Sequence, residues 1–164
     1  MRDNSTRMNH RARVLIVDDH VAFAEKCKAI LESHFEVVGI VLDGSTLTRA
    51  VAKLKPEVVI IDMAMHPWSG FDLGEQVKAA RPAAKAIYMT AASDFDDAVL
   101  AFRLGGSGYV SKLDFPDELL AAVRTAIRGD LHLSRRVMQK SARTRVPCVL
   151  TEDRSWQGCQ LEAH

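Results

Sequence analysis

The sequence has little of what several classes of protein require. Cysteine occurs three times in 164 residues, and Cys27, Cys148 and Cys159 are too scattered for a disulfide framework or a zinc site. No apolar run approaches the roughly 20 residues that a membrane-spanning helix needs. The polar N-terminus also lacks the apolar core of a signal peptide. We therefore expect a cytoplasmic protein with no membrane partner.

A large charge of either sign is missing too. The 22 Lys and Arg residues nearly balance the 21 Asp and Glu residues, which leaves a net charge of +1. Residues 14–123 are nevertheless acidic, with 16 acidic and 10 basic side chains, whereas both ends of the chain are basic. This distribution suits a metal site with a nucleic-acid-binding arm, but the interpretation we favour is an ordinary domain with solvated tails.

Two short apolar runs predict strands that are buried on both faces. Residues 58–62 read Val-Val-Ile-Ile-Asp, and residues 13–17 read Arg-Val-Leu-Ile-Val. Continuous runs of this kind are typical of the centre of a parallel sheet. Both end in acid, at Asp62 and at the pair Asp18 and Asp19.

The rest of the chain alternates strand and helix patterns. Further strands are expected at residues 37–40, 85–90 and 108–111, with apolar residues at helical spacing between and after them. This alternation predicts an α/β fold, a doubly wound, five-stranded parallel sheet in the flavodoxin-like order 2-1-3-4-5.

One domain accounts for most of the chain. We expect residues 12–130 to form it, residues 1–11 to be a disordered N-terminal tail, and residues 131–164 to be a linker and an irregular C-terminal tail.

The predicted topology brings polar side chains from several strand ends to one edge of the sheet. A single Asp after a strand more often caps the next helix than serves a reaction. Here the strand ends supply three carboxylates, a hydroxyl and an amine, and parallel strands present such groups at the edge where ligands bind. These residues are Asp18, Asp19, Asp62, Thr90 and Lys112.

The composition of this set favours phosphoryl chemistry with a metal ion. Two unit charges ~4 Å apart repel by about 4 kcal/mol at an effective dielectric constant of about 20, and Lys112 alone cannot balance three carboxylates. Oxygen ligands favour Mg²⁺. A carboxylate can also act as a nucleophile and form an aspartyl phosphate, whose oxygens a hydroxyl and an ammonium group would hold.

Residues 12–130 resemble the receiver domain of two-component response regulators. The segments Val14–His20 and Gly105–Lys112 are most similar to the subfamily with a LuxR-type helix-turn-helix output. The resemblance implies that Asp62 accepts a phosphoryl group from a sensor histidine kinase. It also implies a Mg²⁺ site, two phosphoryl-binding residues and a two-residue switch. The corresponding residues are Asp18, Asp19, Asp62 and the Ala64 carbonyl for Mg²⁺, Thr90 and Lys112 for the phosphoryl group, and Thr90 with Tyr109 for the switch.

The loop after Asp62 departs from the family pattern. The family usually has Met-Pro followed by Gly, whereas this chain reads Met65-His66-Pro67 before Gly70. His66 is then a metal ligand or, the interpretation we favour, a solvent-facing loop residue. Trp68 is either an aromatic for docking a partner or a lid over the loop.

Three classes of function are compatible with these residues. The first is a phosphorylation switch, not an enzyme acting on a separate substrate. It signals through a changed protein-interaction face, and a homodimer formed on phosphorylation is one form of this output. The second is a phosphatase resembling the haloacid dehalogenase family, which is disfavoured because Ala64 stands where that family has a second Asp. The third is a phosphate-independent binding module, and the altered loop at His66 leaves this class open.

The C-terminal part predicts no DNA reader. Residues 149–152 resemble the opening of the DNA-binding domain of the LuxR-type subfamily, but residues 153–164 are too few for a helix-turn-helix unit with its supporting helices. A truncated transcriptional regulator is the corresponding alternative. We expect no sequence-specific DNA binding by these 164 residues.

Overall fold

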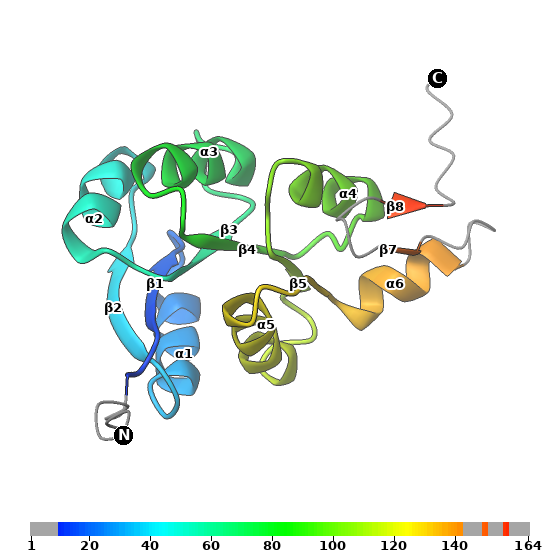
Figure 1. The fold of residues 1–164 in the computed structure, drawn as a ribbon, viewed down its shortest axis with the longest axis horizontal. Coiled ribbons are helices and arrows are strands. Elements are labelled where there is room, and N and C mark those ends of the chain that lie inside the picture. Colours follow the sequence, from blue (N-terminus) through cyan, green and yellow to red (C-terminus); the bar gives the residue numbers. More distant parts are fainter. Residues whose placement is uncertain (1–9, 143–148, 151–155, 158–164) are drawn as a thin grey trace, which may run out of the picture.

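The computed structural model describes residues 10–142, 149–150 and 156–157 (Figure 1). Strands and helices alternate along the chain, as the apolar pattern predicts. The elements are β1 (Arg13–Val17), α1 (Val21–Leu31), β2 (Glu36–Val41), the 3₁₀ turn η1 (Gly44–Thr46), α2 (Leu47–Leu54), β3 (Val58–Asp62), α3 (Gly70–Ala80), β4 (Lys85–Thr90), α4 (Phe95–Arg103), β5 (Gly108–Ser111), α5 (Asp117–Ile127), β6 (His132–Leu133), α6 (Arg135–Ala142), β7 (Val149–Leu150) and β8 (Trp156–Gln157).

The main sheet is parallel and has the order β2-β1-β3-β4-β5-β6. The predicted order 2-1-3-4-5 is therefore confirmed, but the prediction of five strands is one short. Strand β6 pairs in parallel with the outer side of β5, where His132 faces Gly108 and Leu133 faces Tyr109. A two-residue strand carries no periodic apolar pattern, and it is held by its neighbour rather than by its own composition.

Each central strand contributes side chains to two hydrophobic layers because successive side chains point to opposite faces of the sheet. Val59 and Ile61 of β3 enter the layer covered by α2, α3 and α4. Val58 and Ile60 enter the layer covered by α1 and α5. This two-sided burial explains why residues 58–62 have no polar position before Asp62. No helix in the described part of the chain is long and apolar enough to cross a bilayer.

Residues 132–142, which lie in the segment expected to be a linker, pack against the domain. Helix α6 lies beside α4 and β5 (Figure 1). Its Val137 is fully buried in the same cluster as Tyr109. Asp114, which lies between β5 and α5, accepts a hydrogen bond from Ser134 Oγ at 2.9 Å and pairs with Arg136. Helix α5 starts at Asp117 after Pro116, without a side-chain cap.

Candidate functional site

Four strands bring the predicted site residues to one edge of the sheet. Strand β1 is followed by Asp18 and Asp19, β3 ends in Asp62, β4 ends in Thr90, and β5 is followed by Lys112. The register explains the proximity of the last two strands, because Thr90 is paired with Ser111 and the Lys112 N–H donates to the Thr90 carbonyl at 2.7 Å.

Asp62 is the most deeply placed carboxylate of this edge. Its side chain is 2% exposed. The Oδ1 atom lies 3.0 Å from Lys112 Nζ and accepts a hydrogen bond from the Ala64 N–H at 3.3 Å. The Oδ2 atom is buried, and within the described residues no hydrogen-bond donor meets it. A buried carboxylate oxygen without a donor is costly unless a cation or a bond to another atom completes it.

Lys112 is the ammonium group that faces these carboxylates. Its Nζ lies 3.2 Å from Asp18 Oδ2 as well as 3.0 Å from Asp62, and it sits 4.5 Å from the centre of the Phe23 ring. Burial alone would lower the pKa of Lys112, but hydrogen bonds and the charges of Asp62 and Asp18 outweigh burial and raise it. Lys112 is therefore positively charged at any physiological pH, and it is placed to meet negative charge next to Asp62.

His20 joins the cluster, and reasoning from the sequence assigned it no role. Its Nδ1 atom lies 3.0 Å from Asp19 Oδ1, 3.3 Å from Asp18 Oδ1 and 3.8 Å from Asp62 Oδ2. The only sequence signal was its position directly after the acidic pair.

The donor set fits a divalent cation. One ligand atom from each of Asp18, Asp19, His20 and Asp62 lies within 4.8 Å of the others. The buried, unpartnered Asp62 Oδ2 belongs to this set, and Lys112 offers one positive charge against three carboxylates. The carbonyl of Ala64 is the predicted fourth oxygen ligand, and Ala64 is exposed in the loop after β3.

Thr90 and Tyr109 lie on the neighbouring strands β4 and β5. Thr90 is buried, and its Oγ1 accepts a hydrogen bond from the Ala92 N–H at 3.1 Å. Tyr109 is fully buried, and burial is the main reason that its pKa is raised to about 12. The aromatic ring thus already occupies the interior, against the layer that contains Val137 of α6.

The altered loop after β3 keeps its unusual side chains away from the cluster. His66 is exposed and is not among the grouped metal-ligand atoms. Trp68 is half-buried against the layer of α2 and α3, and it lies over Gly44, where a Cβ atom would overlap the indole ring. Gly44 is therefore required for this position of Trp68, which packs as part of the domain.

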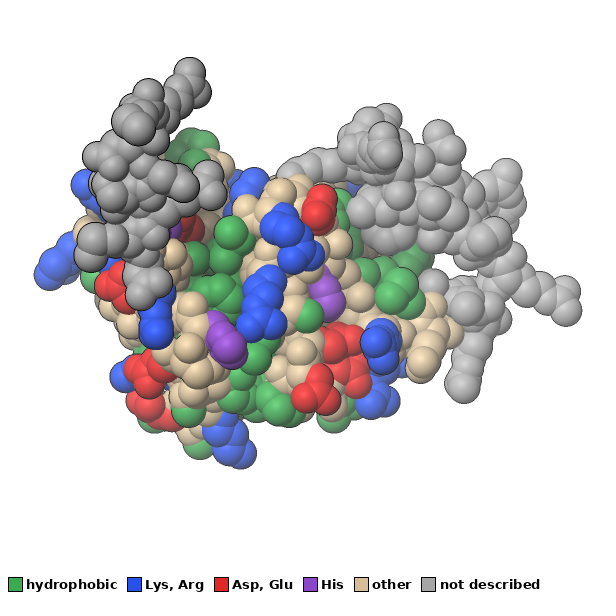
Figure 2. All heavy atoms as spheres, turned by 60° about the horizontal axis from the view of Figure 1, so that its bottom comes forward, with side chains coloured by type: hydrophobic (Ala, Val, Ile, Leu, Met, Phe, Trp, Pro, Cys, Tyr) green, Lys and Arg blue, Asp and Glu red, His purple; other side chains and the backbone are tan. Residues whose placement is uncertain are grey.

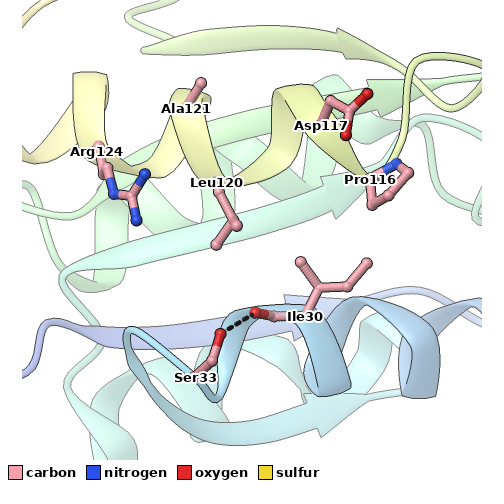
Figure 3. A pocket seen from close by; sticks show the side chains of 7 residues that line it. All are labelled: Ile30, Ser33, Pro116, Asp117, Leu120, Ala121 and Arg124. Atoms are coloured by element: carbon pink, nitrogen blue, oxygen red, sulfur yellow. Dashed lines mark hydrogen bonds between the residues drawn. The ribbon is translucent and has the colours of Figure 1, made fainter.

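A groove lies between α1 and α5, on the side of the molecule shown in Figure 2. Its volume is about 460 Å³. In Figure 3, Ile30 and Leu120 extend into the space between the two helices, while Asp117 and Arg124 lie on α5. The groove contains none of the site residues, and no set of convergent polar groups lines it. The lining residues are Ile30, Ser33, Pro116, Asp117, Leu120, Ala121 and Arg124.

Comparison with known proteins gives a consistent result for the domain. Residues 14–124 match the family model described as response regulator receiver domain. The DNA-binding response regulator MtrA of Mycolicibacterium smegmatis is 33% identical over 118 residues, which are 72% of this chain and 51% of MtrA. The transcriptional regulatory protein LiaR of Bacillus subtilis is 30% identical over 130 residues, or 78% of this chain and 62% of LiaR. The chain thus spans about half to three fifths of the length of these relatives.

Solved structures show the same architecture. A two-component response regulator of the LuxR family from Aurantimonas sp. SI85-9A1 superposes with a TM-score of 0.77 at 27% identity, covering 83% of this chain and 99% of that one. The isolated receiver domain of RcsB from Salmonella enterica, solved in the presence of the phosphomimetic BeF3-, gives a TM-score of 0.72 at 24% identity. That match covers 79% of this chain and 98% of the RcsB chain, and at this identity it shows the fold alone.

Proposed function

This chain belongs to the response regulator receiver family, and from that premise we propose that Asp62 accepts a phosphoryl group from the phosphohistidine of a sensor histidine kinase. An Asp62 oxygen attacks the phosphorus atom, and a P–O bond forms as the P–N bond breaks. The released imidazole nitrogen keeps the electron pair and takes up a proton from solvent. The protein promotes its own phosphorylation and dephosphorylation and turns over no separate substrate.

The observation that carries this proposal is the state of the Asp62 carboxylate. Oδ1 is held by Lys112 and the Ala64 N–H, so the carboxylate has a fixed orientation. Oδ2 is buried without a hydrogen-bond donor among the described residues, so it is the oxygen left to be completed by a metal ion or by phosphorus. Asp62 is not the cap of the next helix, because α3 is capped by Ser69, whose hydroxyl accepts from the Asp72 N–H.

The neighbouring residues have separate roles in the transfer. Asp18, Asp19, Asp62 and the Ala64 carbonyl would hold Mg²⁺, which would supply positive charge next to the phosphoryl oxygens. Lys112 exchanges part of its contact with Asp62 for a phosphoryl oxygen, which it can do with little movement because its Nζ is already 3.0 Å from Oδ1. The Thr90 hydroxyl donates to another phosphoryl oxygen. Charge on these oxygens increases in a loose transition state, so prearranged donors accelerate the transfer.

We further propose that the signal leaves through the face of α4, β5 and α6. Helix α6 is attached to the two loops that follow the phosphoryl-binding residues. Lys140 Nζ donates to the Ala92 carbonyl at 3.2 Å, two residues after Thr90, and Arg136 Nη2 lies 3.1 Å from Asp114 Oδ1, two residues after Lys112. Movement of Thr90 toward a phosphoryl group shifts Ala92, weakens the contact with Lys140 and frees α6. The surface uncovered in this way binds a partner or a second copy of the chain.

The assignment of Asp62 is tested by intact-mass spectrometry after incubation with acetyl phosphate and Mg²⁺. We expect one added phosphoryl group on the wild type, none on Asp62→Asn, and little when EDTA is present. Asp130→Asn is the matched control, because Asp130 is an exposed carboxylate at the far end of α5. Undiminished labelling of Asp62→Asn would overturn the assignment. A wild type that takes up no phosphoryl group would favour a phosphate-independent binding module.

A further inference from the structure

His20 places an imidazole nitrogen inside the carboxylate cluster. The Nδ1 atom contacts a carboxylate oxygen of Asp18 at 3.3 Å and of Asp19 at 3.0 Å, although the side chain as a whole is 67% exposed. One edge of the ring therefore faces the cluster, while much of the side chain lies in solvent. Of the described residues, His20 is the one histidine grouped with the acids as a candidate metal ligand.

The spacing of these atoms is that of neighbouring ligands on one ion. Mg²⁺ and similar ions hold their ligands at about 2.0–2.1 Å, so two ligands at a right angle lie about 3.0 Å apart and two opposite ligands about 4.2 Å apart. The distances from His20 Nδ1 to Asp19, Asp18 and Asp62 oxygens are 3.0, 3.3 and 3.8 Å. The buried Asp62 Oδ2 at the end of this series has no hydrogen-bond donor among the described residues, which is a second sign of a missing positive partner.

The His20 ring meets the carboxylates of the cluster, where its Nδ1 is within hydrogen-bonding distance of Asp18 Oδ1 at 3.3 Å, and it does not cap the following helix. His20 precedes α1 as its N-cap residue, but the side chain makes no capping hydrogen bond. The backbone is instead held by its own N–H, which donates to Asp18 Oδ1 at 2.8 Å. The loop can therefore keep its shape when the ring is removed, and the ring nitrogen can turn from the carboxylates to a bound metal ion.

We propose that His20 Nδ1 is a direct ligand when a first-row transition metal ion is bound by Asp18, Asp19 and Asp62. The inference rests on the metal site of the proposed function and deepens it by naming the class of metal. A site with carboxylate oxygens alone suits hard ions such as Mg²⁺, whereas an imidazole ligand favours first-row transition metals such as Co²⁺ and Zn²⁺. His20 therefore increases the affinity of the site for Co²⁺ and Zn²⁺ relative to its affinity for Mg²⁺.

The test compares the binding of Co²⁺ and Mg²⁺ to the full chain by isothermal titration calorimetry, with the visible absorption of bound Co²⁺ as a second readout. Loss of a residue that only orients a metal ligand typically costs 10–100-fold in affinity, so loss of a direct ligand should cost at least about tenfold. We expect His20→Ala to weaken Co²⁺ binding by that factor, to change the Co²⁺ spectrum and to leave Mg²⁺ affinity nearly unchanged. His66→Ala, which removes an exposed histidine from the neighbouring loop, should change neither.

Two results would overturn the proposal. Equal Co²⁺ affinity and an equal spectrum in the wild type and His20→Ala would show that the ring is not a ligand. Tighter binding of both ions by His20→Ala would show that the ring competes with the metal for the carboxylates. Labelling by acetyl phosphate in Mg²⁺ is measured on the same proteins. A wild type that binds Co²⁺ through His20 but takes up no phosphoryl group would refute the proposed function and leave this inference intact.

Discussion

Replacing Val137 with Asp should detach helix α6 from the domain. Val137 is fully buried in the same hydrophobic cluster as Tyr109, and burial of such a side chain stabilises by about 1.5–3 kcal/mol. A carboxylate in the same position would be desolvated without a partner, which costs more than the apolar contact contributes. An isolated helix of eight residues is not stable in water. Helix α6 should therefore unfold as a unit rather than adjust around the new side chain.

The loss of Val137 burial sets the size of the change in hydrogen exchange of α6. Loss of about 1.5–3 kcal/mol corresponds to about a ten- to hundred-fold increase in the opening of α6, measured as amide hydrogen exchange over residues 135–142. The ion pair between Arg136 and Asp114 adds little, because the Arg136 side chain is 45% exposed.

Detaching α6 should also strengthen binding of a phosphoryl mimic. The hydrogen bond from Lys140 to the Ala92 carbonyl is the contact that phosphorylation is proposed to weaken, and such a bond contributes about 0.5–1.5 kcal/mol. Because coupling between two sites is reciprocal, a protein without this contact should bind beryllofluoride and Mg²⁺ about two- to tenfold more tightly. Lys140→Met tests the same coupling while leaving Val137 in place.

The matched control is Met138→Asp, which puts the same charge on the next residue of the helix. Met138 is 47% exposed, so this variant should keep wild-type hydrogen exchange and wild-type beryllofluoride affinity. Thermal melting establishes that each variant is folded. If Val137→Asp is folded with α6 in rapid exchange, and its beryllofluoride affinity equals that of the wild type, then α6 is not coupled to the site. Unchanged exchange of residues 90–115 in the wild type with beryllofluoride would also refute the mechanism.

Three further predictions concern the lifetime of the signal, pH and DNA. Ala64 and Ala92 are small and exposed and cannot orient a water molecule, so Ala64→Asn with Ala92→Glu should speed the loss of phosphate by about tenfold or more in a decay assay; equal or slower decay would contradict this reasoning. Burial lowers the pKa of His132 below its ordinary value of 6.5 although Glu118 opposes the shift, so folding stability should fall as the pH drops through about 6.5. Melting curves between about pH 5 and 7 should show a flatter dependence for His132→Asn, and an identical dependence would exclude this residue as the cause. The 164-residue chain should leave no footprint on promoter DNA at about 200 mM salt, and a sequence-specific footprint there would refute that expectation.

The strands of the sheet could be predicted because each one is recognisable from its own short run of residues. Runs such as residues 58–61 are apolar at every position, as a strand covered on both faces requires, and the acids that follow them fall at one edge once the strands are parallel. The proximity of Asp18, Asp62 and Lys112 follows from this topology. The distances among them confirm that the three side chains meet, while the chemical roles of the site residues stay predictions.

Strand β6, helix α6 and the positions of Asp114 and His20 depend on contacts made only in the folded chain, which a local sequence pattern does not reveal. Strand β6 has two residues, and Val137 and Met138 are the only large apolar residues of α6, so neither element has a recognisable apolar stripe. Asp114 looks like a helix cap in the sequence and binds Ser134 and Arg136 because β6 and α6 fold back over it. His20 comes after two acids and precedes a helix, and only the measured distances show that its ring faces the cluster.

The most direct test of the central claim is chemical identification of the phosphorylated residue. Borohydride reduces an aspartyl phosphate to homoserine, which marks the acceptor position permanently in the chain. Reduction of the protein after treatment with acetyl phosphate and Mg²⁺, followed by peptide mass spectrometry, should place homoserine at position 62 and at no other Asp. Homoserine at Asp18 or Asp19, with Asp62 unchanged, would contradict the account.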